Sequence, residues 1–159
     1  LRDKKISDNF STVQDVLKYE IKKNDLINYS YLCCIYPCSG PFLNKTIIKK
    51  AFKIFLKNDA DLLVTISKYE YPPEKAYIKL NNKFMKLKNP KYYRERTQDL
   101  NKYFKDTGSI YFYKINKLIN SEINKNSKIS YLEVPSNSII DIDNPEDLRI
   151  SKLLYSIKN

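Results

Sequence analysis

Two apolar runs, each preceded by a helical pattern, most constrain the fold of this 159-residue chain. They cover residues 29–36 and 60–67, and their near-continuous apolar character is typical of strands buried on both faces. Apolar residues at helical spacing precede the runs, over about 12–24 and about 44–57. This alternation of helix and strand predicts an α/β fold with an open, mostly parallel sheet of the Rossmann-like type.

Polar residues mark where the two helices begin. Ser11 and Gln14 have the spacing of a capping box, and either Asn44 or Thr46 opens the second helix. In open α/β sheets ligands bind beyond the carboxyl ends of the strands. The turn-rich loop at 37–43, which follows the first apolar run, is therefore a candidate binding loop.

The middle of the chain has a different pattern. Between residues 69 and 93, short apolar pieces alternate with Pro72, Pro73 and Asn-rich turns, which predicts short antiparallel strands in an inserted flap. Further strands are expected at 110–113 and 128–134, followed by a strand over 139–143 and a closing helix over about 144–157.

Paired acids lie near the C-terminus, where that last strand meets the closing helix. Asp141 and Asp143 alternate with isoleucines, so a strand would project both carboxylates from one face. Asn144 then fits a helix N-cap and Pro145 the first helical position. Two close carboxylates repel unless a cation lies between them, and such oxygens suit a Mg²⁺ ion that also binds a phosphate. Two solvated acids at a strand end are the alternative.

Composition excludes several classes of site. The chain has no His, which removes Ser-His-Asp and Cys-His catalysis and every His-containing metal site. Cys33, Cys34 and Cys38 lack the spacing of a zinc site or a disulfide framework, so free thiols are expected. The net charge of +11 comes from scattered lysines, so no nucleic-acid partner is expected. No apolar run approaches the length of a membrane span, which predicts a soluble, cytoplasmic protein without a membrane partner.

Five short motifs, in the same order along the chain, resemble the nonulosonic-acid cytidylyltransferases, which make CMP-sialic acid and its relatives. The motifs are Arg2 with residues 6–8, residues 33–36 followed by 41–43, residues 97–100, residues 106–108, and residues 141–147. The second and third motifs are most similar to those of the pseudaminic acid branch. The resemblance covers the whole length of the chain.

The resemblance implies an activity and a fold. Members transfer CMP from CTP to the anomeric hydroxyl of a nine-carbon acidic sugar, with release of pyrophosphate and with Mg²⁺ as the cofactor. Pseudaminic acid is the sugar expected here, and the product would serve cell-surface glycan biosynthesis. The implied fold is that of the nucleotide-diphospho-sugar transferases, with a flap and dimerisation arm at about 69–108 and a homodimer as the assembly.

Residue by residue, the resemblance also assigns the nucleotide and metal contacts. Asp141 and Asp143 match the metal-binding acids, and Asp143 is also placed to deprotonate the sugar hydroxyl as the catalytic residue. Arg2 matches an arginine that contacts CTP, and Thr12 is a second CTP-binding candidate.

The same match assigns the sugar contacts. They are expected from the loop after the first strand and from the flap, at Ser39, Lys75, Gln98 and Lys105. Basic residues there suit an anionic sugar, since attack on an α-phosphate needs charge neutralisation and alignment more than covalent help. Solvated surface charges are the alternative for the lysines.

The chain departs from the family pattern in three places. The loop at 37–41 is one residue longer than usual, which puts the sugar contact at Ser39 in doubt. Residues 105–108 read Lys-Asp-Thr-Gly where the pseudaminic branch commonly has His-Asp-Ala-Gly. The N-terminal strand and the Gly-rich basic loop that grip the triphosphate have no counterpart. We therefore expect a single domain over 1–159 that is an N-terminally truncated, incomplete copy.

Two other functions remain open from the sequence. One is a non-catalytic remnant that serves as an interaction module. The other is a cytidylyltransferase for sialic acid or Kdo, which differs in the acidic sugar that it accepts.

Overall fold

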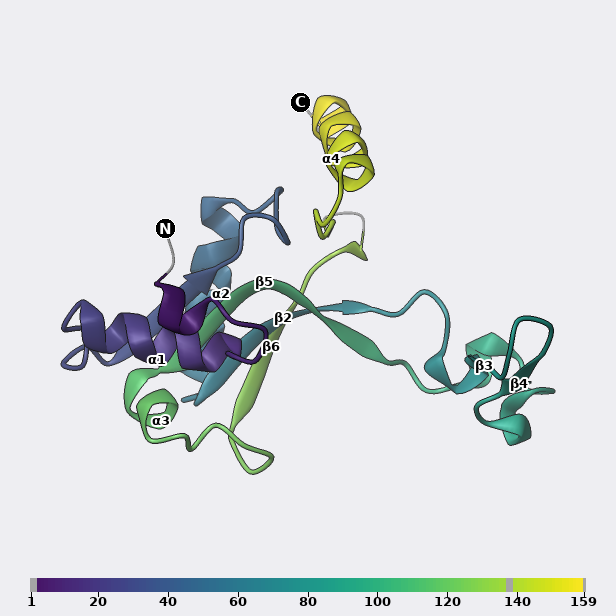
Figure 1. The fold of residues 1–159 in the computed structure, drawn as a ribbon, viewed down its shortest axis with the longest axis horizontal. Helices are drawn as coiled ribbons and strands as arrows, with labels where there is room; N and C mark the ends of the chain where they lie inside the picture. The colour runs from purple at the N-terminus through teal and green to yellow at the C-terminus, as the bar shows by residue number, and fades with distance from the viewer. Residues whose placement is uncertain (1–2, 137–138, 159) are drawn as a thin grey trace.

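The protein is described here from a computed structural model, which describes residues 3–136 and 139–158 (Figure 1). The helices are α1 (Val13–Lys23), α2 (Lys45–Lys57), α3 (Ile115–Ile119) and α4 (Pro145–Lys158). The strands are β1 (Tyr31–Ile35), β2 (Leu62–Lys68), β3 (Tyr77–Lys79), β4 (Met85–Leu87), β5 (Phe104–Lys114) and β6 (Ile129–Glu133). Short 3₁₀ turns lie at Lys4–Ile6, Pro73–Lys75, Pro90–Tyr92 and Thr97–Asp99.

A four-stranded sheet in the order β1-β5-β2-β6 forms the body of the protein. β2 and β6 are parallel, and β5 runs antiparallel to both of its neighbours, β1 and β2. β1, β2 and β6 therefore share one direction, and β5 is the exception in this four-stranded sheet. The predicted α/β class is confirmed, with β5 placed between two strands that precede it in the chain.

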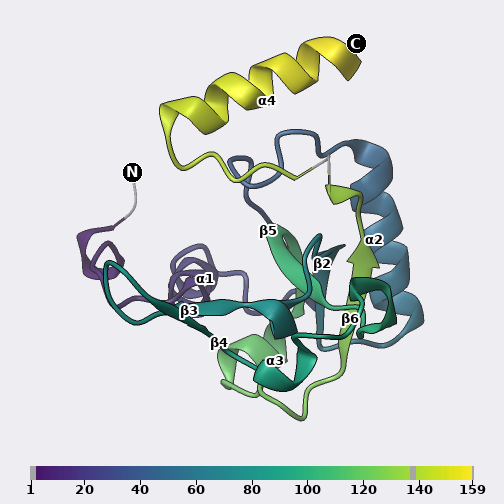
Figure 2. The same ribbon diagram turned by 90° about the vertical axis from the view of Figure 1, so that its right-hand side faces the viewer.

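Helices cover both faces of this sheet, which makes three layers (Figure 2). On one face, Phe55 of α2 packs with Leu63 of β2 and Phe112 of β5. The rings of Phe55 and Phe112 stack with their centroids 5.8 Å apart. The apolar stripe that predicted the second helix is thus the stripe that α2 buries against the sheet.

The opposite face packs against α1 and α3. There Ile21 of α1 and Leu118 of α3 are fully buried together with Tyr113 of β5. Neighbouring residues of β5 therefore serve opposite cores, as the alternation of side chains along a strand requires. The short helix α3 was not predicted from the sequence.

β1 differs from the prediction of a strand buried on both faces. Its five residues alternate between exposed and half-buried, and among the described strands it pairs only with β5. β1 is thus an edge strand, and one of its edges carries no partner in the part of the chain that the structure describes. β2, in contrast, is buried as predicted.

The helix caps are partly as predicted. The capping box of α1 uses Thr12 and Asp15 instead of Ser11 and Gln14, because the Asp15 carboxylate can accept from the Thr12 backbone N–H at 2.9 Å. For α2, Asn44 is the N-cap, and its side chain accepts from the N–H of Ile47 at 3.0 Å.

The middle of the chain forms an arm that extends from the body (Figure 1). Its tip is the antiparallel hairpin of β3 and β4, as expected for a flap of short strands. β5 begins at Phe104, earlier than the predicted strand at 110–113, and its first residues pair with the end of β2. The paired ends of β2 and β5 therefore join the arm to the sheet.

Residues 139–143 are not a strand, which corrects the predicted Asp-bearing strand. They have no ladder partner, and the N–H of Ile142 instead donates to the Cys38 carbonyl oxygen at 3.0 Å. The segment therefore attaches to a loop and not to a sheet edge. The closing helix is confirmed as α4.

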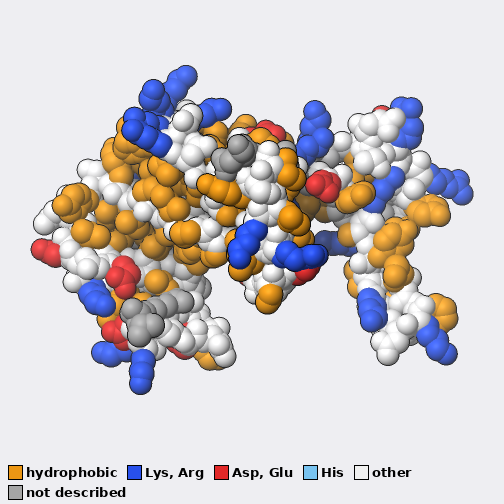
Figure 3. Space-filling model, turned by 90° about the horizontal axis from the view of Figure 1, so that it is seen from above, with side chains coloured by type: hydrophobic (Ala, Val, Ile, Leu, Met, Phe, Trp, Pro, Cys, Tyr) orange, Lys and Arg blue, Asp and Glu red, His pale blue; other side chains and the backbone are white. Residues whose placement is uncertain are grey.

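Lysine and arginine side chains lie in several separate groups on the face seen in Figure 3, with apolar side chains between them. No helix in the described part of the chain is long and apolar enough to span a membrane.

We expect Leu63→Ala to lower the free energy of unfolding by about 2–5 kcal/mol, because Leu63 has no exposed surface and the deletion leaves a cavity between β2 and α2. Urea unfolding followed by circular dichroism measures this loss. Leu153→Ala on α4 is the matched control, and it should cost less than about 0.5 kcal/mol because Leu153 is 56% exposed. Equal losses for the two variants would contradict the described core.

Candidate active site

The loop after β1 and the segment before α4 meet at the carboxyl end of β1. The hydroxyl of Ser39 donates to Asp141 Oδ1 at 2.8 Å, and the Cys38 carbonyl accepts from the N–H of Ile142. Ser39 is buried, at 8% exposed, whereas Asp141 is exposed. The structure thus brings together two predicted site residues that are 102 positions apart in the chain.

A bulge in β5 lies next to Ser39 and helps to hold this contact. The pairing of β2 with β5 shifts between Val64 and Ile66, which leaves residues 107–110 of β5 opposite a single residue, Thr65. The Thr65 hydroxyl oxygen accepts from the N–H of Ile110 at 3.2 Å. A side chain therefore takes the place of a backbone acceptor where the ladder is interrupted.

Gly108 lies at the centre of the bulge with a φ of +67°, a backbone conformation that favours glycine. A Cβ there would lie 3.4 Å from the hydroxyl oxygen of Ser39. The missing side chain of Gly108 also lets the loop lie close against β5.

The cap of α4 organises the residues that follow Asp141. Asn144 Oδ1 accepts from the N–H groups of Glu146 and Asp147 at 2.9 and 3.0 Å. The Asp147 carboxylate in turn accepts from the N–H groups of Asp143 and Asn144, each at 3.1 Å. The predicted cap at Asn144 is confirmed, and it holds the backbone of Asp143 while that residue remains exposed.

The donor set fits a cation that is bound jointly by protein and ligand. Asp141 and Asp143 are exposed carboxylates on one short segment, and no group of three possible ligand residues occurs in the described ranges. Mg²⁺ commonly takes one or two carboxylates and completes its shell with water and phosphate oxygens. The two aspartates are therefore enough for a Mg²⁺ ion that arrives with a nucleotide phosphate.

The CTP candidates are less completely described. Arg2 lies outside the described residues. Thr12 caps α1 and lines an open cavity of about 440 Å³ together with Val13, Gln14, Tyr111 and Tyr113.

Tyr111 was not predicted as a site residue. Burial and a hydrogen bond to Asp106 at 2.9 Å raise the pKa of the Tyr111 phenol, so it stays protonated as a donor. Its ring also lies near the rings of Tyr36 and Tyr113, at 5.9 and 6.1 Å between centroids. Residues 108–111 read Gly-Ser-Ile-Tyr, a pattern that predicts a strand. This pattern does not show whether Tyr111 lines a cavity or packs in the core.

The remaining sugar candidates belong to the arm or to its junction with the body. The ammonium group of Lys75 donates to the Glu95 carbonyl oxygen within the arm. Gln98 lines a small cavity of about 80 Å³ with Lys68, Tyr69 and neighbouring residues. Lys105 is exposed on β5 and pairs with Ser67 in the ladder. Within residues 3–136 and 139–158, no hydrogen bond joins these three side chains to one another.

Comparisons with known proteins decide the family. No family model matches the sequence. Two pseudaminic acid cytidylyltransferases, from two strains of Campylobacter jejuni, are each 30% identical over 163 aligned positions, which include all of this chain and 69% of the relative. The chain belongs to the pseudaminic acid cytidylyltransferase family. This confirms the predicted resemblance, and with it the expectation of an enzyme.

One further relative agrees with this family, and one solved structure shares the fold. A Helicobacter pylori protein, whose name combines a pseudaminic acid cytidylyltransferase with a hydrolase, is 30% identical over 115 residues, which are 72% of this chain and 22% of that protein. The structure of a CMP:2-keto-3-deoxy-manno-octonic acid synthetase, complexed with CTP, superposes with a TM-score of 0.61 at 13% identity. It covers 95% of this chain and 70% of the other chain, and it supports the predicted fold.

We expect Asn144→Ala to destabilise the first turn of α4 by about 1 kcal/mol, because two backbone N–H groups lose their acceptor. Hydrogen exchange should become faster at the amides of residues 143–147, with little change in the core strands. Asn144→Asp keeps an acceptor at the same position and should retain the protection. Unchanged exchange in Asn144→Ala would show that the cap does not hold this segment.

Proposed function

We propose that this chain transfers CMP from CTP to the anomeric hydroxyl of a nine-carbon acidic sugar, pseudaminic acid, with release of pyrophosphate. The names of the Campylobacter relatives support the reaction and the sugar. The observation that carries the proposal is the attachment of the Asp141 segment to the loop at 36–43, by the Ser39 hydrogen bond and the Ile142 to Cys38 bond. This attachment places exposed carboxylates beside the loop expected to receive the sugar.

The reaction needs alignment and control of charge. The sugar hydroxyl oxygen forms a bond to the α-phosphorus of CTP while the bond from that phosphorus to the bridging oxygen of the β-phosphate breaks. Pyrophosphate leaves with the electron pair, and the hydroxyl proton passes to a carboxylate. We assign the Asp143 carboxylate this proton, because its backbone is held by the α4 cap and its side chain is exposed.

Asp141 and Asp143 would hold the Mg²⁺ ion. When bound, the ion neutralises charge on the phosphate oxygens and orients the triphosphate. Asp141 contributes through a carboxylate of which one oxygen already accepts from Ser39.

The acidic sugar requires cations close to the reacting hydroxyl. We propose that Lys75 and Lys105 attract the sugar carboxylate and that Gln98 hydrogen-bonds to its hydroxyl or amide groups. The Lys75 ammonium group would leave the Glu95 carbonyl oxygen and donate to the sugar carboxylate instead. A neutral acceptor is then replaced by an anionic one. Thr12, beside the cavity that contains Tyr111, is proposed to lie on the CTP side.

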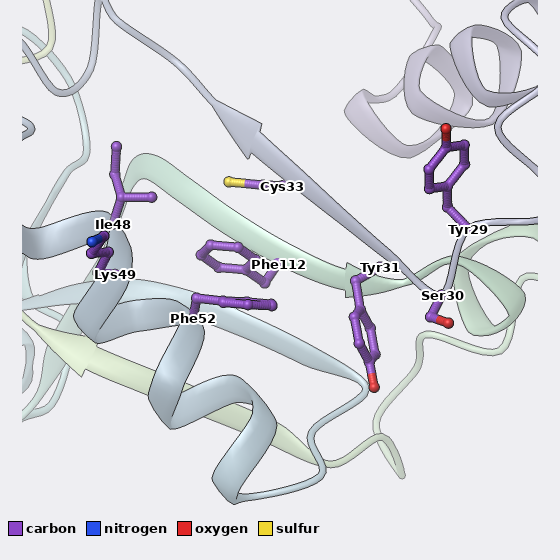
Figure 4. A pocket seen from close by; sticks show the side chains of 8 residues that line it. All are labelled: Tyr29, Ser30, Tyr31, Cys33, Ile48, Lys49, Phe52 and Phe112. Carbon is purple, nitrogen blue, oxygen red and sulfur yellow. The ribbon is translucent and has the colours of Figure 1, made fainter. Parts of the chain in front are cut away.

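We also propose that the triphosphate is gripped by residues that this sequence does not contain. The alignment covers 69% of each Campylobacter relative, so the relatives have a portion without a counterpart here. The edge of β1 that has no partner among the described strands supports this proposal. Beside it lies an open, mainly apolar cavity of about 420 Å³, whose wall includes Tyr31, Cys33, Phe52 and Phe112 (Figure 4).

The arm suits contact with a second copy of the chain. Large apolar side chains gather on it and are 43–82% exposed; they are Tyr71, Tyr77, Ile78, Leu80, Phe84 and Met85. We propose that a homodimer covers them, since such a strip is costly to leave in water. We place the reaction in the cytoplasm, where CTP is available.

The first test compares the chain alone with a mixture in which the portion of the Campylobacter relative outside the alignment is added as a separate polypeptide. We expect pyrophosphate release from CTP, Mg²⁺ and pseudaminic acid to rise by about 10²-fold in the mixture, because the triphosphate gains backbone and cationic donors. A chain that is equally active without the addition would refute the proposed incompleteness. Inactivity of both, with cooperative melting, would favour a non-catalytic module.

The second test is Asp143→Asn in the more active preparation. Turnover should fall by about 10²-fold or more, because the amide neither accepts the proton nor binds the cation as a carboxylate does. Glu146→Gln is the matched control, since Glu146 lies in the first turn of α4 and its carboxylate forms an ion pair with Arg149 at 2.6 Å. A near-normal rate for Asp143→Asn would remove this residue from the mechanism.

A further inference from the structure

We propose that Ser39 is a positioning residue, which fixes the Asp141 carboxylate for cation binding and does not itself contact the sugar. This inference rests on the proposed function, in which Asp141 holds Mg²⁺. It differs from the sequence expectation for Ser39, which placed this side chain against the sugar.

The hydroxyl of Ser39 points to Asp141. Its oxygen lies 2.8 Å from Asp141 Oδ1, and an ionised carboxylate can only accept, so the hydroxyl proton points to Asp141. Ser39 is only 8% exposed. Its single proton is therefore committed to Asp141, and little of its surface is open to a ligand.

The backbone of Ser39 is also held by a chain of hydrogen-bonded, buried hydroxyls. The Ser109 hydroxyl donates to the Ser39 carbonyl oxygen at 3.0 Å. Ser109 and Thr107 share a hydrogen bond of 2.9 Å, and Thr107 and Thr65 share one of 2.7 Å. Thr65 then accepts from the N–H of Ile110 at 3.2 Å.

The closest acceptors favour one order of donors in this chain. Each hydroxyl has one proton, and the Ser109 hydroxyl lies 3.0 Å from the Ser39 carbonyl oxygen and 3.3 Å from the Thr107 carbonyl oxygen, so we assign its proton to the nearer Ser39 carbonyl. Thr107 must then donate to Ser109, and Thr65 must donate to Thr107. In this order each hydroxyl hydrogen points from β2 and β5 toward the loop, and Ser39 donates its own hydrogen bond to Asp141.

The hydrogen bond uses one lone pair of Asp141 Oδ1, so we assign the other oxygen, Oδ2, to the cation. Carboxylates that bind metals are commonly oriented by such neighbouring donors, and loss of the donor typically lowers metal affinity 10–100-fold. Four buried hydroxyls in one small region cost stability unless they are paired, so a role at the site explains why apolar side chains do not replace them.

The test is the affinity of the full chain for Mn²⁺, used as a paramagnetic substitute for Mg²⁺ and measured from the EPR signal of the free ion. We expect Ser39→Ala to raise the dissociation constant about 10-fold, at a temperature where the thermal melt shows that the variant is folded. Ser130→Ala is the matched control, because Ser130 is equally buried and hydrogen-bonded at 2.9 Å to Asn58. It should bind Mn²⁺ as the wild type does.

Asp141→Asn separates the two proposals. If Asp141→Asn loses Mn²⁺ while Ser39→Ala binds it normally, the positioning role is wrong and the metal role of Asp141 stands. If neither variant differs from the wild type, both are wrong. Should Ser39→Ala not fold, Ser109→Ala carries the same test, since it releases the Ser39 carbonyl and keeps the Ser39 hydroxyl. It should weaken Mn²⁺ binding in the same direction, and unchanged binding would overturn the proposal.

Discussion

The structure depends on the pairing of β5 with both β1 and β2. From Ile110 to Lys114 it lies between β1 and β2 as an inner strand, and from Phe104 to Asp106 it pairs with the end of β2 at the base of the arm. The two stretches are out of register, and the bulge at residues 107–110 absorbs the difference. The arm, the sheet and the loop after β1 all take their positions from this bulge.

The bulge also explains why a polar cluster lies inside the protein. An interrupted ladder leaves backbone groups without their usual partners, and Thr65 and Thr107 supply hydroxyls at that point. The same hydroxyls reach Ser39 through Ser109. The hydroxyls that pair the backbone at the bulge are thus connected to Asp141 by hydrogen bonds. The exposed Asp141 carboxylate is held by this buried network.

Sequence reasoning predicted the elements that have strong local signals. The stripe of α2, the cap at Asn144 and the hairpin of the arm follow from residues that are neighbours in the chain. It did not predict that residues 139–143 leave the sheet, because alternation of Ile and Asp describes any extended segment and not its hydrogen-bond partners. The Ser39 to Asp141 contact was missed for the same reason, since no local pattern reports on a bond across 102 positions.

The central claim is that the cation binds at the Asp141 segment beside the loop after β1. Paramagnetic broadening in an amide NMR spectrum, recorded while Mn²⁺ is added to the full chain, tests it directly and detects weak sites. The account predicts that the amides of residues 38–40 and 141–143 broaden first. Asp59 and Asp61 are a second pair of acids that lie close together, but Lys114 pairs with both, at 2.7 and 3.5 Å. Broadening there first, with sharp signals at 141–143, would contradict the account.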